Sequence, residues 1–418
     1  MRTLDKVCAS VALLFVALNC ALGETQSPPV ELRGLWVVRS SLTSPASIHN
    51  IVSEAESHHF NALFVQVRGR GDAYYKSTLE PRAEELADTP ASFDPLQTII
   101  DDAHVHHMQV HAWMNTCYIW GDKKMPKSKM HILWQHPDWI ARDARGRFTL
   151  GPSHECEGVF MTPSNTASRK HIHDVFMEVV RNYDVDGLHF DYIRYPNGSY
   201  DFSDSALSRF KQTLVGTLPG PLAAHLESAR LRNRLAYVQY FPAEWARFRR
   251  DQITQMVGSI SADAKRLKPG IIISAAVFAD SKDALNSRGQ DWKTWLQRGY
   301  VDAIVPMAYG SSTALVSKQI KDAVNCAQQA HRFVYAGLGS WHISPDSTIA
   351  KIEAARVLGT QGSVLFSYGG ITRDGTRTDY LDKITHSCFS GAAQVPTMPW
   401  MHQQASKRVA VGESTPPQ

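Results

Sequence analysis

The chain lacks the residue clusters that several large functional classes require. Its 44 lysines and arginines are interspersed with 40 aspartates and glutamates, and the net charge is only +4. A nucleic-acid-binding face needs clustered basic residues, so we expect no nucleic-acid partner. No Cys-x-x-Cys motif occurs and no grouping of cysteine and histidine has the pattern of a zinc site. We therefore expect no metal and no organic cofactor.

Cysteine is scarce, and part of it falls in a leader. The chain has 6 cysteines, of which Cys8 and Cys20 lie in the first 23 residues. Arg2 and Lys6 precede a short apolar run that ends in small residues, which predicts a signal peptide over residues 1–23. Cleavage with lipid attachment at Cys20 is the alternative. In both cases we expect an exported protein, periplasmic or extracellular.

The remaining cysteines predict disulfides. An even number of cysteines in an oxidising compartment is typical of disulfide-bonded proteins. We expect Cys117 to pair with Cys156, since both flank one long loop, and Cys326 to pair with Cys388. A buried free thiol at each position is the alternative.

Short apolar runs alternate with amphipathic patterns along the chain. Most of the runs are continuous, as in strands buried on both faces. Strands are predicted over residues 31–38, 62–67, 109–114, 187–192, 271–278, 303–309, 333–338 and 362–368. Helices are predicted between and after them, over residues 47–59, 94–107, 168–183, 243–267, 290–298, 314–330, 345–357 and 376–386.

This alternation predicts an α/β fold, a closed (β/α)₈ TIM barrel over residues 24–388. A doubly wound open sheet would need a glycine-rich phosphate loop after the first strand, and residues 37–47 contain no glycine. Long loops follow strand 3 (residues 115–167) and strand 4 (residues 193–270). Residues 389–418 lose periodicity and gain Pro, Ser and Gln, which predicts a flexible tail.

The chemistry of a barrel lies where its strands end. The predicted strand ends contain no Cys–His pair and no Gly-x-Ser-x-Gly motif. They are instead rich in aromatic, amide and arginine side chains, and Asp191 closes the fourth strand. The other side chains that we expect to contact a substrate are Arg68, Arg70, Asp72, Trp113, Asn115, Tyr192, Arg194, Tyr309 and Trp341.

Aromatic rings beside carboxylates suit a sugar, whose C–H faces pack on rings and whose hydroxyls need directional partners. Cleavage of a glycosidic bond needs a proton donor and a nucleophile or base. A barrel end can desolvate an aspartate and raise its pKa, so we expect Asp191 to be catalytic. The alternatives are structural. Asp191 then pairs with Arg194 or Arg68, the Arg68, Arg70 and Asp72 side chains form an internal salt-bridge knot, and the rings fill barrel layers.

Eight motifs in order carry a family resemblance. They are RGLWV, FNALFVQVRGRGDAYY, VHAWMN, HPDW, YDVDGLHFDYIRYP, FRRDQI, DWKTWLQRGYVDAIVPMAY and YAGLGSW. With them the chain resembles glycosyl-hydrolase-like family 10, exported bacterial barrel proteins related to glycoside hydrolases, from about residue 31 to 385. The resemblance implies a (β/α)₈ fold and action on a glycan, with bacterial cell-wall strands as one substrate. It places Asp191 on the strand-4 carboxylate of the family.

The second catalytic carboxylate stays open. In a looser similarity to chitinases, Ile193 falls where their catalytic Glu stands, which argues against that mechanism, and Tyr309 matches their strand-6 tyrosine. Retaining barrels of the commonest clan use a Glu at the end of strand 7, which here ends YAGLGSW without an acid. Asp280 and Glu155 rank first among the possible partners, followed by the others, which are Asp72, Glu157 and Glu244.

The sequence thus predicts a secreted, monomeric glycoside hydrolase that acts on a polysaccharide. Two alternatives remain. A non-catalytic glycan-binding barrel is favoured by the missing strand-7 acid and by Ile193. An amidase or deacetylase acting on the same wall polymer would need a metal held by His and Asp, a set that the strand ends lack.

Overall fold

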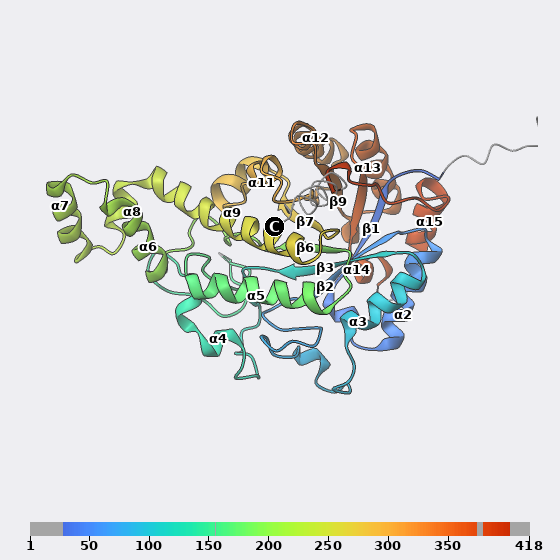
Figure 1. The fold of residues 1–418 in the computed structure, drawn as a ribbon. Coiled ribbons are helices and arrows are strands. Elements are labelled where there is room, and N and C mark those ends of the chain that lie inside the picture. Colours follow the sequence, from blue (N-terminus) through green and yellow to red (C-terminus); the bar gives the residue numbers. More distant parts are fainter. Residues whose placement is uncertain (1–27, 155, 374–378, 402–418) are drawn as a thin grey trace, which may run out of the picture.

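The computed structural model describes residues 28–154, 156–373 and 379–401. Eight parallel strands close into a barrel in the order β1–β10–β9–β8–β7–β6–β3–β2 (Figure 1). The barrel strands are β1 (Leu32–Val37), β2 (Ala62–Arg68), β3 (Gln109–Asn115), β6 (Gly187–Asp191), β7 (Ile272–Phe278), β8 (Ala303–Ala308), β9 (Phe333–Gly339) and β10 (Gly362–Phe366). The predicted fold and all eight predicted strands are confirmed.

Helices surround the barrel. The eight predicted helices are present as α2 (Pro45–Ser57), α3 (Pro95–Val105), α5 (Thr166–Asn182), α9 (Pro242–Leu267), α11 (Trp292–Gln297), α12 (Thr313–Gln329), α13 (Pro345–Val357) and α15 (Asp379–Cys388). Capping explains several of the starts. Ser44 and Asp94 accept hydrogen bonds from backbone N–H groups in the first turns of α2 and α3, and each is followed by a proline.

Two long insertions leave the barrel on the side of the strands' carboxyl ends. The first follows β3 and contains α4 (Ile132–Gln135) and an antiparallel pair, β4 (Tyr118–Trp120) with β5 (Val159–Phe160). The second follows β6 and contains α6 (Asp204–Val215), α7 (Gly220–Arg230) and α8 (Ala236–Tyr240). These three helices project to one side of the barrel (Figure 1) and share a hydrophobic cluster with the first turns of α9.

A buried histidine, His189, lies in the barrel interior below the carboxyl ends of the strands. The Trp36 indole N–H donates to His189 Nε2 at 3.2 Å, and His189 Nδ1 lies 2.9 Å from Ser274 Oγ. Because an indole only donates, Nε2 of His189 is the acceptor and Nδ1 carries the proton. Burial lowers the pKa of His189 well below its usual value. The neutral ring therefore fixes the Trp36 side chain, which reaches the rim above.

The start of the predicted tail differs from the expectation. Residues 389–401 pack across the amino-terminal end of the barrel instead of leaving it. Met398 is buried in the cluster that fills the barrel interior, and the Trp400 indole N–H donates to Asp302 Oδ1 at 2.9 Å. Apolar residues among the prolines anchor this stretch. Residues 402–418 lie outside the described part of the chain, as do residues 1–23 and Cys20.

The predicted disulfides are wrong in this structure, where Cys117, Cys156, Cys326 and Cys388 are all free thiols. Helix α13 packs against both α12, which carries Cys326, and α15, which ends at Cys388, and so lies between these two cysteines. The Cys156 thiol donates to the backbone carbonyl of Gly158 at 2.8 Å. Burial raises the pKa of Cys117 to about 12, which makes that thiol unreactive.

No helix among the described residues has the length and apolar composition needed to cross a membrane.

The free thiols give a first prediction. In a thiol titration under denaturing conditions, the chain from residue 24 onward will show four reactive thiols per molecule. Reductant will leave its melting temperature unchanged, because a native disulfide worth about 2–4 kcal/mol is not there to be lost. A fall of several degrees in reductant, with fewer titrated thiols, would contradict this structure.

Candidate active site at the carboxyl ends of the barrel strands

A cavity of about 260 Å³ opens at the carboxyl ends of the barrel strands. Residues on or just after β1, β2, β3, β6, β7, β8 and β10 line it, together with Tyr118 of β4. The lining residues are Trp36, Val38, Arg39, Gln66, Trp113, Asn115, Tyr118, Asp191, Tyr192, Arg194, Ala276, Met307, Tyr309 and Phe366. Closure of the barrel therefore gathers residues from positions 36 to 366 around one space.

Asp191 is the acid among the described residues that line this cavity. Its side chain is only 7% exposed. Oδ2 accepts a hydrogen bond from the Trp113 indole at 3.0 Å, and Oδ1 accepts one from the backbone N–H of Tyr192 at 2.6 Å. Burial raises the pKa of Asp191 to about 6, against the opposing effects of Arg194 and these two hydrogen bonds. Asp191 can therefore exchange a proton close to neutral pH.

A chain of hydrogen bonds connects Asp191 to the neighbouring strand ends. The Trp113 indole N–H is shared between Asp191 Oδ2 and Asn115 Oδ1, at 3.0 Å from each. The Asn115 amide N–H donates to the backbone carbonyl of Gly69 at 2.8 Å, which fixes the orientation of the amide. The Arg39 guanidinium donates to Gln66 Oε1 at 3.1 Å. The first three barrel strands thus contribute polar groups to one side of the cavity.

Arg194 occupies an aromatic box beside Asp191. Its guanidinium carbon lies 4.4 Å from the ring centre of Tyr192 and 5.1 Å from that of Phe278. Nη2 donates to the Glu157 carboxylate at 3.0 Å, and Nε and Nη1 have no hydrogen-bond partner among the described residues. Arg194 is 4% exposed. The structure thus brings Glu157, from the first insertion, to the same side of the site.

The backbone at Tyr192 lies in the left-handed region, with φ of 48°. A non-glycine residue in this region carries a conformational cost, which the surrounding contacts must offset. The Tyr192 ring packs on Tyr118 at 4.7 Å between ring centres, and its N–H holds Asp191. The bend after β6 therefore sets the direction in which the carboxylate points.

Aromatic rings form the opposite wall. Tyr309, which follows β8, contacts Trp341 at 5.1 Å and Phe366 at 5.6 Å between ring centres. Trp341 is 44% exposed and stands at the mouth rather than in the cavity lining. Burial and the charge of Asp191 raise the pKa of Tyr309 well above its usual value, so the phenol keeps its proton. These rings present flat apolar faces beside a carboxylate.

The structure separates the three charged residues predicted after strand 2 from the cavity. Arg68 is fully buried, and its guanidinium binds Glu80 at 2.6 Å and the backbone carbonyls of Asn115 and Thr116. Arg70 pairs with Asp72 at 3.4 Å and with Glu85 at 2.7 Å. None of the three lines the cavity. Their contacts match the internal salt-bridge knot that was the alternative from the sequence.

Of the two first-ranked partner carboxylates, Asp280 lies within the described residues, and it does not line the cavity around Asp191. Asp280 is exposed and caps α10 (Ser281–Asp283), where its Oδ1 accepts hydrogen bonds from two backbone N–H groups. These bonds lower the pKa of Asp280 and stabilise its charged form. Glu155 lies outside the described residues. Glu244 is exposed in the first turn of α9 and does not line the cavity.

Sequence reasoning missed several lining residues. Trp36, Gln66 and Met307 lie inside predicted strands and are not among the site residues expected from the sequence; all three line the cavity at the upper end of the barrel interior. One signal could have identified Gln66, because it is the polar residue that interrupts the apolar run of β2. Tyr118 comes from β4, an element that was not predicted.

No group of three or more His, Cys, Asp and Glu residues within the described ranges is arranged to hold a metal ion.

Comparisons with known proteins match this chain to one family and to proteins named as glycosyl hydrolases. The family described as "Glycosyl hydrolase-like 10" matches residues 31–347. Glycosyl hydrolase YngK of Bacillus subtilis (strain 168) is 24% identical over 396 residues, which cover 86% of this chain and 69% of that protein. Glycosyl hydrolase DigH of Escherichia coli (strain K12) is 25% identical over 377 residues, which cover 78% of this chain and 76% of that protein.

A solved structure supports the fold. The glycoside hydrolase domain of PgaB (BpsB) from Bordetella bronchiseptica superposes with a TM-score of 0.59 at 13% identity. The match covers 84% of this chain and 99% of that one. At this identity the likeness shows a shared barrel fold.

The buried Arg68–Glu80 pair gives a second prediction. Replacing Arg68 by Met leaves the buried Glu80 carboxylate with only its 3.3 Å contact to His171, and we expect a loss of about 3–5 kcal/mol in the free energy of unfolding. Against the opposing effect of burial, Arg68 and His171 lower the pKa of Glu80 to about 2, so the stabilisation is present above the unfolded pKa and is lost as pH falls toward 2. The deficit of the variant will therefore be larger at pH 7 than at pH 4.

Denaturant unfolding at the two pH values measures this. Arg147→Met is the control, because Arg147 pairs with Asp143 on the surface and is 63% exposed. We expect it to cost less than about 1 kcal/mol at either pH. Equal losses in the free energy of unfolding for the two variants would show that the buried Arg68–Glu80 pair stabilises the fold no more than the surface pair does.

Proposed function

Because this chain belongs to the glycosyl hydrolase-like 10 family, we propose that it is a glycoside hydrolase that cleaves a polysaccharide. Bacterial cell-wall glycan strands are the proposed substrate. The observation that carries the proposal is a buried carboxylate with a pKa near 6, set among aromatic rings and amides at the mouth of the barrel. We also propose that residues 1–23 direct export, which would bring the enzyme to such a substrate.

Asp191 serves as the proton donor in this proposal. A glycosidic oxygen leaves only when it is protonated, and a carboxylic acid with a pKa near the working pH is suited to that step. Burial keeps a fraction of Asp191 protonated where an exposed aspartate would be fully ionised. The Trp113 indole and the Tyr192 N–H then stabilise the carboxylate that remains after proton transfer.

Glu157 is the partner carboxylate that the described residues offer. Its charge raises the pKa of Asp191, which indicates that the two groups interact across the site. Arg194 binds Glu157 at 3.0 Å and lies close enough to Asp191 to lower its pKa. Arg194 thus holds Glu157, the group that we propose as base or nucleophile, in an ion pair beside Asp191. Glu157 is 46% exposed, so water reaches it.

The sugar-binding surfaces follow from the same geometry. Tyr309, Phe366 and the Trp341 ring at the mouth offer C–H contacts to a pyranose. Asn115 and Gln66 offer amide groups to its hydroxyls on the other side of the cavity. A hydroxyl-rich polymer fits this division.

The third prediction tests Asp191. Asp191→Asn keeps the shape of the side chain and removes its acidity, so we expect a loss of about 10²–10⁴ in kcat on peptide-free wall strands, measured as new reducing ends. Asp280→Asn makes the same chemical change at the exposed cap of α10 and will keep wild-type activity. A fully active Asp191→Asn protein would remove Asp191 from the mechanism.

The fourth prediction concerns pH. The donor must be protonated, so kcat/KM will fall as pH rises through about 6, the pKa of Asp191. Arg194→Met removes the cation that lowers this pKa, and the falling limb will therefore move to higher pH. The pH–rate profiles of both proteins measure this. A limb that stays in place, or moves to lower pH, argues against Asp191 as the titrating acid.

One observation favours a second candidate function, a glycan-binding barrel without catalysis. Asp191 is the one acid among the described lining residues, and β9 ends without a carboxylate. Such a protein would bind the same polymer and release no reducing ends. Long incubation with purified wall strands, scored by mass, separates the two functions.

A further inference from the structure

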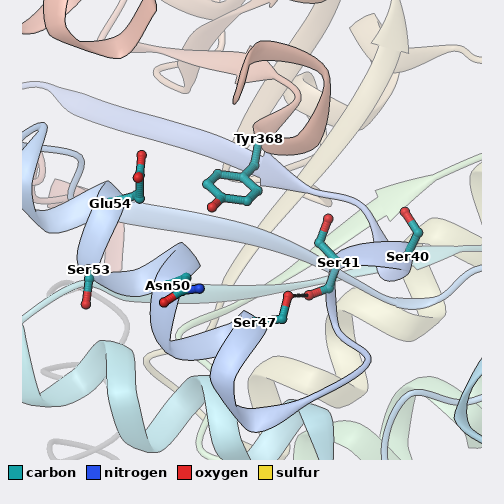
Figure 2. Close-up of a pocket in the computed structure, with 7 residues that line it drawn as sticks. All are labelled: Ser40, Ser41, Ser47, Asn50, Ser53, Glu54 and Tyr368. Atoms are coloured by element: carbon teal, nitrogen blue, oxygen red, sulfur yellow. Dashed lines mark hydrogen bonds between the residues drawn. The ribbon is translucent and has the colours of Figure 1, made fainter. Parts of the chain in front are cut away.

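A second cavity, of about 610 Å³, lies at the same end of the barrel. Figure 2 shows its lining residues, which come from the turn after β1, from α2, and from α14 (Tyr368–Thr372). They are Ser40, Ser41, Ser47, Asn50, Ser53, Glu54 and Tyr368. None of them takes part in the site around Asp191, and every one carries a hydroxyl, an amide or a carboxylate.

Two side chains that line this cavity, Glu54 and Ser47, can accept further hydrogen bonds. Oε2 of Glu54 is buried and has no hydrogen-bond partner among the described residues. A buried acceptor without a donor is costly, and native proteins usually satisfy it. Ser47 Oγ donates to the Ser41 carbonyl at 2.7 Å, which leaves the Ser47 oxygen free to accept. The cavity therefore presents acceptors and donors that a hydroxyl-rich ligand would complete.

An aromatic ring completes the set. In the view of Figure 2 the Tyr368 ring lies between Glu54 on one side and Ser41 on the other, with Asn50 and Ser47 below it. A flat ring opposite hydroxyl and amide groups is the combination that binds a pyranose. The charge of the lining argues against other ligands. Glu54 is its one charged residue, so an anion is disfavoured, and a single carboxylate is too few ligands for a metal ion.

The position of the cavity connects it to the catalytic site. Arg39 lines the first cavity and the next residue, Ser40, lines the second. At the end of β10, Phe366 lines the first cavity and Tyr368, two residues later and the first residue of α14, lines the second. The two cavities therefore border the same two strand ends, those of β1 and β10.

We propose that the cavity between α2 and α14 is a second saccharide-binding site, which holds an uncharged sugar unit of the polymer whose cleavage point lies at Asp191. The identity of the polymer rests on the proposed function. The preference of the cavity for a sugar rests on its own lining residues. It makes the enzyme prefer long chains, because short fragments reach one cavity and long ones reach both.

The experiment fills the cavity from its exposed side. Asn50→Trp places a large side chain in it, and Ala46→Trp places the same side chain on an exposed position of α2 outside the lining. Both changes are made in the chain from residue 24 onward carrying Asp191→Asn, so that substrate stays intact. Titration calorimetry measures binding of peptide-free wall fragments of two to eight sugar units, and thermal melting checks folding.

We expect the Asp191→Asn protein, without either tryptophan, to bind the longest fragments about tenfold or more tightly than the disaccharide. Asn50→Trp will remove this advantage and leave disaccharide binding unchanged, whereas Ala46→Trp will behave like the parent. Should Asn50→Trp melt early, Ser53→Leu provides a smaller obstruction in the same cavity. Two results overturn the proposal, a parent without length dependence and cavity variants that keep it.

The outcome is separable from the proposed function. If the wild-type chain releases no reducing ends while Asn50→Trp loses long-chain affinity, the proposal of hydrolysis is rejected and the second site is supported. If the wild-type chain releases reducing ends and the Asn50→Trp variant keeps the full length dependence, the second site is rejected and hydrolysis is supported.

Discussion

The site depends on removing one carboxylate from water. Asp191 ends a strand whose neighbours on both sides are also strands, so its oxygens face a cavity walled by rings and amides instead of solvent. Desolvation raises its pKa, and the hydrogen bonds from Trp113 and Tyr192 together with the charge of Arg194 limit that rise. The balance leaves a group that holds or releases a proton near neutral pH. Without closure of the barrel, the residues that exclude water would lie far apart.

The barrel was predictable from the sequence because its strands are buried on both faces. Such strands appear as continuous apolar runs, and Pro45 and Pro95 after capping residues mark where helices begin. Asp191 was predictable for a related reason, since a carboxylate directly after an apolar run must lie at the carboxyl rim. The same reasoning failed for Arg68. Its strand end was correctly placed, but the side chain points away from the cavity to Glu80, a residue whose position depends on a loop.

The insertions limit what a sequence can predict about the site. Glu157 and Tyr118 enter it from a loop whose path is set by the short β4–β5 pair and not by periodicity. The predicted Cys326–Cys388 disulfide was wrong for a similar reason. Both cysteines lie toward the end of the sequence, but α13 packs between the helices that carry them. Positions on the regular scaffold follow from local pattern. Positions on insertions follow from contacts between distant segments.

The segment that crosses the amino-terminal end of the barrel closes the interior from below. Met398 and Trp400 lie against the first residues of the strands, and Trp400 contacts Asp302 and the Phe333 ring. The barrel is therefore plugged by its own carboxyl-terminal segment, and a molecule that reaches Asp191 arrives from the side where the strands end.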